Sequence, residues 1–438
     1  MLKRKAMNQL IEWKNNKTKQ AMLVLGARQV GKTTLIREFA KKNYGNLIEL
    51  NFYENPAAIK TISQAENVDD FLLRLSVLTN QPFTNKNALI FLDEIQEYQD
   101  VLTWVKFLVE QKNFDIILSG SLLGLDAFSS ARSFPVGYLQ KITMYPLDFQ
   151  EFCSATNLPD ELWTQMAECV LNRTQVPDFI HDAMMSRFRN YLLIGGMPDV
   201  VQAYIDTSQI APVRNAQKAI SDLYEYDISK YVEDKTEARQ IRMVYEAIPA
   251  QLNCPSKRFK YARLSKNLRF GDMETAFDWL SSAGTSIEVT RVSELAFPLG
   301  LSEDRNAFKL FSNDVGLLTS KLMGNVDFEI INNQLNINYG SIFENVVAQE
   351  LYAQGLELHY YANKRHGEID FVIEDKTTGD LRLVEVKSGK DYKRHSALNN
   401  VLNSTSIDNA FILYSGNVEE DKRRLYLPVY ATSLITDI

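Results

Sequence analysis

The stretch Gly26-Ala27-Arg28-Gln29-Val30-Gly31-Lys32-Thr33 matches the G-x-x-x-x-G-K-[ST] pattern of a phosphate-binding P-loop. It follows the apolar run of residues 22–25 and precedes residues 34–41, whose apolar spacing is that of an amphipathic helix. The two glycines let backbone N–H groups turn toward the phosphates, and the N-terminus of the helix adds a favourable dipole. The stretch therefore predicts a strand, a phosphate-binding loop and a helix, in that order.

Each residue of this loop is expected to contribute to the binding of ATP, and the set is Gly26, Ala27, Arg28, Gln29, Val30, Gly31, Lys32, Thr33 and Thr34. Lys32 is expected to reach the β- and γ-phosphates and to act in catalysis, and the Thr33 hydroxyl is expected to hold Mg²⁺. ATP and Mg²⁺ are therefore the expected cofactors. A glycine turn without a ligand is the alternative, and the strand and helix on either side disfavour it.

A second motif follows the apolar residues 88–92, which have the pattern of a strand buried on both faces. It is the acidic pair Asp93-Glu94 at the end of that strand. Asp93 is expected to hold the metal from the side opposite Thr33, and Glu94 is expected to polarise the attacking water as a catalytic residue. An acidic strand end that caps the next helix is the alternative, and the preceding P-loop disfavours it.

A further candidate strand, residues 115–118, runs into the turn Ser119-Gly120-Ser121. Ser119 or Ser121 is placed to hydrogen-bond the γ-phosphate or the attacking water, and we take Ser119 as the catalytic candidate. A tight turn with a capping serine is the alternative. With two more apolar runs, the first part of the chain holds five candidate strands separated by helical stretches, which predicts an α/β fold with a parallel sheet flanked by helices.

In these motifs and their order, the chain resembles the AAA+ ATPases of bacteria and archaea that carry a C-terminal domain of unknown function. The later matching segments are Tyr145-Pro146-Leu147-Asp148-Phe149-Gln150-Glu151-Phe152, Gly195-Gly196-Met197-Pro198, Tyr226-Asp227-Ile228-Ser229-Lys230-Tyr231, Ile248-Pro249-Ala250-Gln251-Leu252 and Asp314-Val315-Gly316-Leu317-Leu318. The resemblance covers nearly the whole chain and implies an ASCE-type P-loop sheet, a winged-helix module and a C-terminal nuclease-like module. It implies no reaction for the protein as a whole.

Relatives in that family often have an arginine or lysine directly after the glycine that precedes the last strand of the sheet, whereas this chain has Val136-Gly137-Tyr138. An arginine finger contributes about 10³–10⁵ to the rate, so hydrolysis is expected to be slow or to depend on another residue. Arg132 is the candidate substitute, and a solvated loop arginine is the alternative.

Residues 237–252, 263–268 and 273–283 have helical patterns, and the alternation in residues 286–292 suggests a β wing behind them. Three helices followed by a hairpin are typical of a winged helix, a module that often binds DNA. Residues 257–270 contain six basic residues, three aromatic residues and no acid, a composition typical of nucleic-acid contact. Contact between domains, with solvated charges, is the alternative, and the net charge of −7 leaves both open.

The last hundred residues contain a second set of candidate site residues. Two alternating segments read as a hairpin that places Glu385 and Lys387 on one face and Asp370 across from them, and an upstream helix is expected to bring Glu344 close. Carboxylates that hold Mg²⁺ beside a lysine suit metal-dependent phosphodiester cleavage. The pattern resembles the PD-(D/E)XK nucleases, which makes Asp370 and Glu385 the expected metal ligands. A fold retained for binding or oligomerisation without cleavage is the alternative.

The expected fold class is therefore α/β, with a parallel P-loop NTPase sheet flanked by helices, then a helical or winged-helix module, then a small α/β nuclease-like domain. For a chain of 438 residues we expect several domains. The expected ranges are residues 1–155 for an AAA+ P-loop ATPase core, 156–220 for a helical lid or linker, 221–335 for a winged-helix-like module and 336–438 for a PD-(D/E)XK nuclease-like domain.

Composition limits the class of protein and its cellular location. The sequence has no apolar stretch long enough to span a bilayer, and its basic N-terminus has no apolar signal core, so a cytoplasmic protein without a membrane partner is expected. Three cysteines without metal-ligand spacing fit reduced buried thiols, and four scattered histidines form no zinc-type pattern.

Two functions of different class follow from these residues. In the first, the chain is a Mg²⁺-dependent AAA+ protein that binds and hydrolyses ATP, a switch or motor whose C-terminal modules recognise a nucleic acid or a protein partner. In the second, it is an ATP-regulated, metal-dependent nuclease that acts on DNA or RNA. A nucleotide-sensing scaffold is a third, which Glu94 argues against because a sensor needs no second carboxylate. Oligomerisation is left open.

Overall fold

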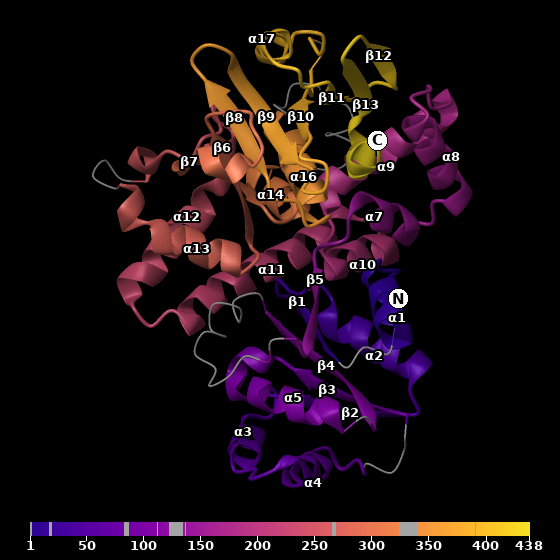
Figure 1. Ribbon diagram of the computed structural model, residues 1–438, viewed down its shortest axis with the longest axis vertical. Helices are drawn as coiled ribbons and strands as arrows, with labels where there is room; N and C mark the ends of the chain where they lie inside the picture. Colours follow the sequence, from indigo (N-terminus) through magenta and orange to yellow (C-terminus); the bar gives the residue numbers. More distant parts are fainter. Residues whose placement is uncertain are drawn as a thin grey trace. The chain divides into compact units, whose positions relative to one another are not determined.

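The computed structural model describes residues 2–16, 20–82, 87–111, 113–121, 135, 137–264, 269–323, 340–389 and 391–438. Contacts divide the chain into two compact units, Met1–Tyr145 with Ser282–Gly284 and Pro146–Ser281 with Thr285–Ile438 (Figure 1). Among the described residues, no helix is both long and apolar enough to cross a membrane.

The first unit is built on a sheet of five parallel strands in the order β2-β3-β4-β1-β5 (Figure 1). The strands are β1 (Ala21–Gly26), β2 (Asn46–Asn51), β3 (Ala88–Asp93), β4 (Phe114–Ser121) and β5 (Leu139–Met144). Every residue of β1 and β3 is buried, as expected of strands covered on both faces. The prediction of an α/β fold with a parallel sheet is confirmed, and β4 lies between the P-loop strand β1 and the acidic strand β3.

Helices cover both faces of this sheet, and they are α1 (Ala6–Asn16), α2 (Lys32–Asn43), α3 (Pro56–Ser63), α4 (Val68–Thr79) and α5 (Leu102–Glu110). The apolar side chains of α3, α4 and α5 form one core cluster with the side chains that β1 to β4 turn toward them. The buried face of α2, which includes Leu35 and Phe39, packs against the same strands outside that cluster. Because all five strands are parallel, their carboxyl ends meet at one edge, where such sheets place their ligands.

The second unit begins with helices, which are α7 (Phe149–Ala155), α8 (Asp160–Leu171), α9 (Asp178–Ile194), α10 (Pro198–Thr207), α11 (Ile210–Tyr231), α12 (Lys235–Leu252) and α13 (Glu274–Ser282). Helices α12 and α13 correspond to two of the three helices expected for the winged helix. The third falls on a short 3-10 turn, Tyr261–Arg263, and on residues 265–268, which lie outside the described residues.

An eight-stranded sheet follows, in the order β12-β13-β11-β10-β9-β8-β6-β7 (Figure 1). Its strands are β6 (Ser286–Val292), β7 (Glu303–Ser312), β8 (His359–Asn363), β9 (Gly367–Glu374), β10 (Leu381–Val386), β11 (Asn409–Tyr414), β12 (Glu419–Asp421) and β13 (Arg424–Pro428). Its helices are α14 (Val315–Met323), α16 (Gly340–Tyr352) and α17 (Ser396–Ser404), and the 3-10 segment Val429–Asp437 ends the chain.

The strand expected to form a separate wing belongs to this sheet. β6 pairs with β7 in the antiparallel direction and with β8 in the parallel direction, and β8 pairs in turn with β9. The sheet is therefore continuous from β6 to the hairpin β9–β10, across the expected boundary between residues 335 and 336. Sequence periodicity found the strand but not its partners, because pairing between distant segments leaves no local pattern.

Two of the segments that carry the family resemblance contact each other in this unit. The backbone N–H of Gly196 donates to Asp314 Oδ2 at 2.6 Å, and that of Leu317 donates to Asp314 Oδ1 at 2.9 Å. Asp314 is fully buried, and burial raises the pKa of its carboxyl group to about 6, although these backbone donors act in the opposite direction. A Cβ at Gly316 would lie 2.1 Å from the carbonyl oxygen of Ile194, so α14 and the end of α9 touch through backbone atoms.

We predict that Gly316→Ala destabilises the protein although the residue lies in a helix. Alanine in a helix interior is normally favoured over glycine by about 1 kcal/mol. Here the added methyl group overlaps the Ile194 carbonyl, and such overpacking typically costs about 1–3 kcal/mol. Thermal unfolding should show a lower midpoint for Gly316→Ala and no loss for Gly300→Ala, where no atom lies within 4 Å of the added Cβ. Equal midpoints for the two variants would contradict this packing.

Candidate nucleotide site

The loop between β1 and α2 makes a tight turn. Gln29 and Gly31 have left-handed backbone conformations, with φ of 64° and 91°. At Gly26, an added Cβ would lie 2.4 Å from the carbonyl oxygen of Met144 on β5. Close packing therefore requires glycine at position 26, and the positive φ favours it at position 31. Strand, loop and helix follow one another as the sequence predicts.

Lys32 begins α2, and its side chain is buried. Its ammonium group donates to the carbonyl oxygens of Gly26 and Ala27, each at 3.0 Å. Burial lowers the pKa of Lys32, and the carboxylates of Glu94 and Asp93 oppose that shift. The ammonium group is thus held by the loop, within electrostatic reach of the acidic pair that follows β3.

Asp93 is the centre of the site. Its carboxylate accepts hydrogen bonds from Thr33 Oγ1 of α2 at 2.9 Å, from Asn51 Nδ2 of β2 at 3.1 Å and from the Ser119 hydroxyl of β4. Asp93 is 1% exposed, and burial raises the pKa of its carboxyl group while the hydrogen bond from Ser119 lowers it. The structure therefore brings three of the predicted site residues together.

The oxygen atoms at Asp93 suit Mg²⁺, a hard cation that prefers octahedral oxygen ligands at about 2.0–2.1 Å. Two adjacent ligands of such an octahedron lie about 2.9 Å apart. The distance between Thr33 Oγ1 and Asp93 Oδ2 is also 2.9 Å, so both atoms can ligate one ion without a change in the backbone. These two residues fit the role that the sequence predicts for them.

Glu94 has an uncommon backbone conformation, and its carboxylate accepts a hydrogen bond from a nearby side chain. Its φ of 56° lies in the left-handed region, which is uncommon for residues other than glycine and often marks functional sites. The side-chain amide of Gln96 donates to Glu94 Oε2, and Gln96 Oε1 accepts from the backbone N–H of Ser121 at 3.2 Å. Gln96 therefore connects the predicted catalytic carboxylate to the end of β4.

Sequence reasoning missed Asn51 and Gln96. Asn51 ends β2 as Asp93 ends β3, and its place at the carboxyl end of a parallel strand is the signal that would have found it. No such signal marks Gln96, because its two contacts depend on the 3-10 turn Ile95–Glu97. Arg132, the candidate arginine finger, lies outside the described residues.

The predicted acidic residues of the second unit have several cationic partners. Asp370 Oδ1 lies 3.8 Å from Lys309 Nζ, and Asp370 Oδ2 accepts from the backbone N–H of Val386 at 2.9 Å. Glu344 pairs with Lys257 and, at 3.9 Å, with Lys309. In the part of the chain that the structure describes, no group of three or more His, Cys, Asp and Glu side chains is arranged to hold a metal ion.

The remaining pair, Glu385 and Lys387, is joined by an ion pair of 2.5 Å, as their two-residue spacing on a strand suggests. Glu385 Oε2 lies 3.9 Å from His395 Nδ1. Burial raises the pKa of Glu385, and Lys387 opposes that shift. Lys309 was not among the residues predicted from the sequence, since it lies on β7, far from the hairpin along the chain.

The aromatic residues of the basic segment are part of a core, so of the two interpretations that the sequence left open, stacking of these rings on nucleic acid gains no support. Phe259 is 2% exposed and stacks on Phe308 with a centroid distance of 5.9 Å, and Tyr261 and Phe270 pack against Phe277. Their faces are therefore covered by protein rings. The basic side chains of Arg258, Lys260, Arg263 and Arg269 are exposed.

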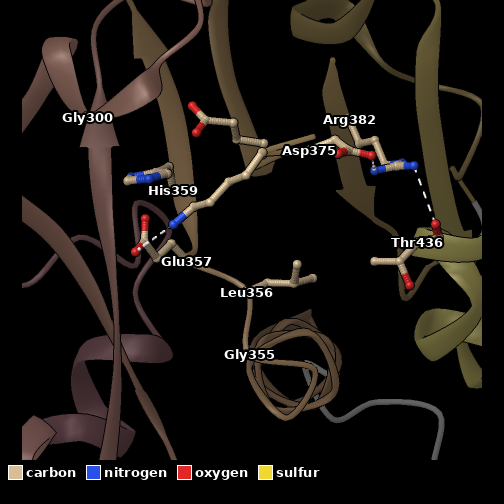
Figure 2. Close-up of a pocket in the computed structure, with 10 residues that line it drawn as sticks. Gly300, Gly355, Leu356, Glu357, His359, Asp375, Arg382 and Thr436 are labelled. Carbon is tan, nitrogen blue, oxygen red and sulfur yellow. Dashed lines mark hydrogen bonds and ion pairs between the residues drawn. The ribbon is translucent and has the colours of Figure 1, made fainter. Parts of the chain in front are cut away.

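A cavity of about 330 Å³ lies elsewhere in the second unit, lined in part by Glu357, His359, Asp375 and Arg382 (Figure 2). Two pairs of its charged side chains form ion pairs, Lys376 with Glu357 at 3.0 Å and Arg382 with Asp375 at 3.3 Å, and Glu374 accepts a hydrogen bond from the Leu299 N–H at 2.6 Å. None of the predicted site residues lines this cavity. Because most of its charged side chains are already paired, we assign it no ligand.

Three parts of the chain match family models. Residues 18–153 match the AAA domain, residues 185–327 match a domain of unknown function (DUF8612), and residues 339–432 match a second domain of unknown function (DUF4143). No curated protein matches the chain. The last two models assign no activity, so the nuclease-like and winged-helix expectations gain no support from them.

Solved structures resemble the chain distantly. A Walker-type ATPase of Pyrococcus abyssi is 14% identical, with a TM-score of 0.43 over 74% of this chain and 96% of the other. The Aeropyrum pernix Orc1 protein in complex with DNA is 12% identical, with a TM-score of 0.30 over 74% and 92%. The Hsp104–ADP complex of S. cerevisiae is 14% identical, with a TM-score of 0.28 over 65% and 38%. At these scores the likeness carries no argument about function.

The family assignment of the first unit rests instead on the match of its sequence to a family model and on the geometry of its site. The AAA domain model covers the P-loop, the acidic strand β3 and the serine-bearing strand β4. Lys32, Thr33 and Asp93 meet at the carboxyl edge of the parallel sheet. Residues 18–153 therefore match the AAA domain in sequence and have the geometry of a P-loop nucleotide site.

Proposed function

We propose that the protein is a Mg²⁺-dependent AAA+ ATPase that uses ATP binding and hydrolysis as a switch or motor. The observation that carries this proposal is the buried Asp93 carboxylate, to which α2, β2 and β4 each donate one side-chain hydrogen bond. An acidic residue with only a structural role would not require three side-chain hydrogen bonds beside a P-loop lysine. A carboxylate that ligates a metal ion does need such partners, because hydrogen bonds from neighbouring residues fix the orientation of its oxygen atoms.

In the proposed mechanism, residues 26–34 bind ATP through the loop backbone, and Lys32 leaves its carbonyl partners to contact the β- and γ-phosphates. Thr33 and Asp93 would hold Mg²⁺, and a bound ion would supply positive charge that neutralises the phosphates. Glu94 accepts a proton from the attacking water. Ser119, which donates to Asp93, is proposed to hydrogen-bond the γ-phosphate or the attacking water.

The Gln96 amide gives Glu94 a defined position in this scheme. Its two ends are occupied by Glu94 Oε2 and the Ser121 N–H, so a shift at the end of β4 would also move the Glu94 carboxylate. We therefore propose that Gln96 is a positioning residue through which β4 affects the catalytic base. Because this chain lacks the arginine or lysine that relatives often have after Gly137, hydrolysis is proposed to be slow or to depend on another residue, for which Arg132 stays the candidate.

The second unit is proposed to recognise the partner, either a nucleic acid or a protein, as a helical and winged-helix-like part followed by a nuclease-like part. The exposed side chains of Arg258, Lys260 and Arg263 are the groups best placed for phosphate contact. The alternative, an ATP-regulated nuclease, draws its support from the hairpin β9–β10, in which Asp370 accepts from the N–H of Val386, next to Glu385.

If the partner is a nucleic acid, its binding to these basic residues should stimulate ATP turnover. We predict stimulation by DNA or RNA that falls as salt is raised, because phosphate contacts release counterions. The triple variant Arg258→Gln, Lys260→Gln, Arg263→Gln should lose that stimulation and keep its basal turnover. Stimulation that the variant retains would exclude this surface, and no stimulation by either nucleic acid would favour a protein partner.

We predict that Lys32→Ala weakens ATP binding about a hundredfold or more and leaves the fold intact. The variant loses a charge-assisted contact worth about 3 kcal/mol, or roughly a hundredfold in affinity, while the backbone of the loop is retained. Calorimetric titration with ATP measures the loss, and circular dichroism checks the fold. Lys41→Ala, an exposed lysine of the same helix, is the matched control. Unchanged affinity in Lys32→Ala would contradict the P-loop assignment.

We predict that Glu94→Gln binds ATP normally but hydrolyses it about 10²–10⁴ times more slowly, the range expected for loss of a general base. The amide has nearly the same shape as the carboxylate but accepts no proton from water. Phosphate release measures turnover, with Glu97→Gln as the control because it makes the same change three residues away. Turnover within a few-fold of the wild type would place the base elsewhere.

A further inference from the structure

Lys309 is a buried cation surrounded by carboxylates. It lies on β7, its side chain is 1% exposed, and its neighbours along the strand, Phe308 and Leu310, are buried apolar residues. Its ammonium group lies 2.8 Å from Glu368 Oε1, 3.8 Å from Asp370 Oδ1 and 3.9 Å from Glu344 Oε2. The carboxylates come from β9 and α16, so Lys309 ties two distant parts of the chain to β7.

A second lysine faces the same carboxylates. Lys257 Nζ pairs with Glu344 Oε1, the oxygen of that residue that does not face Lys309. Two ammonium groups therefore oppose the three carboxylates of Glu344, Glu368 and Asp370. Burial, followed by the charge of Asp370, raises the pKa of Glu344 to about 7.

Lys309 itself stays charged in this setting. Burial lowers its pKa, but the carboxylates of Glu344, Asp370 and Glu368 more than offset that effect, so its pKa is raised. The backbone of Lys309 is also held from two sides, by Val289 of β6 and by a β-bridge to Arg258. The backbone position of Lys309 is therefore fixed by the sheet, and its side chain is buried among the carboxylates.

Resemblance to the PD-(D/E)XK nucleases implies a divalent cation among Glu344, Asp370 and Glu385. The residues present do not fit that ion. Such a cation needs several oxygens at about 2.0–2.6 Å and a site of net negative charge. Here Glu344 and Asp370 face the Lys309 ammonium group, Asp370 Oδ2 is taken by the Val386 N–H, and Glu385 is paired with Lys387.

We infer that Lys309 takes the place of the divalent cation in the nuclease-like part of the chain. An ammonium group inside the acidic cluster supplies the positive charge and excludes a metal ion by repulsion. Without a metal ion to activate water, the cluster is a structural ion network rather than a site of phosphodiester cleavage. This inference concerns the second unit and does not depend on whether the P-loop hydrolyses ATP.

Titration of the full-length, nucleotide-free protein with Mn²⁺ tests the inference directly. Comparison with Asp370→Asn distinguishes a Mn²⁺ ion bound at the Lys309 cluster from one bound at Asp93. The expected result is that the wild type and Asp370→Asn give the same binding curve up to about 1 mM Mn²⁺, and that neither cleaves plasmid or single-stranded substrates. Mn²⁺ binding or cleavage by the wild type that Asp370→Asn removes would overturn the inference.

Removal of the lysine provides a test by gain of binding. In Lys309→Ala the carboxylates of Glu344, Glu368 and Asp370 lose their central cation, so this variant is expected to bind Mn²⁺ at least about tenfold more tightly and to show a midpoint of unfolding that rises with Mn²⁺. The double variant Lys309→Ala, Asp370→Asn should lose that gain. Lys376→Ala is the control, because it removes an exposed lysine from an ion pair in the same unit.

Each outcome of this second test bears on the inference. A folded Lys309→Ala variant without any gain in Mn²⁺ binding would show that the lysine is not what excludes the ion, and would overturn the inference. A variant that folds only when Mn²⁺ is added would support it, because the ion then replaces the missing charge. If Lys309→Ala does not fold under either condition, the titration of the wild type against Asp370→Asn decides.

Discussion

Asp93 joins three elements of the first unit that lie far apart in the sequence. Thr33 follows the P-loop, Asn51 ends β2 and Ser119 is near the end of β4, and each donates a hydrogen bond to the same carboxylate. An ionised carboxylate that is 1% exposed is costly unless its oxygens are satisfied, so these donors are a condition for placing it there. The order of the strands meets that condition, because β3 lies between β2 and β4. The rest of the proposed nucleotide chemistry depends on this arrangement.

The first unit could be predicted from sequence because its signals are local. The P-loop, the apolar runs of β1 and β3 and the acidic pair Asp93-Glu94 are short segments whose chemistry and structure coincide. Asn51 and Gln96 were not predicted, because their roles depend on contacts that form only in the folded sheet and in a 3-10 turn. Composition alone marks neither residue.

The second unit was harder to predict, since its important contacts join segments that are far apart in the chain. The basic segment near residue 260 has the composition of a nucleic-acid surface, yet Phe259 and Tyr261 pack in an aromatic core with Phe308 of β7. The hairpin β9–β10 was expected from alternation and is present, but the cation that faces Asp370 comes from β7. A pattern of alternating residues locates a strand and leaves its partners undetermined.

The two units thus use buried carboxylates in different ways. At Asp93 the donors are neutral side chains, so the negative charge is left for a cation. At Glu344 and Asp370 the partners include ammonium groups, so the charge is compensated within the protein. The same residue type therefore provides a proposed metal ligand in one unit and an internal ion network in the other.

The most direct test of this account is the effect of Mg²⁺ on ATP affinity in the wild type and in Asp93→Asn. If Asp93 holds the ion between the protein and the phosphates, Mg²⁺ should tighten ATP binding by the wild type about tenfold or more, a change of roughly 1.4 kcal/mol. The same titrations with Asp93→Asn, in the presence of Mg²⁺ and in the presence of EDTA, should give nearly equal affinities. An equal Mg²⁺ effect in the two proteins would contradict the central role of the Asp93 carboxylate.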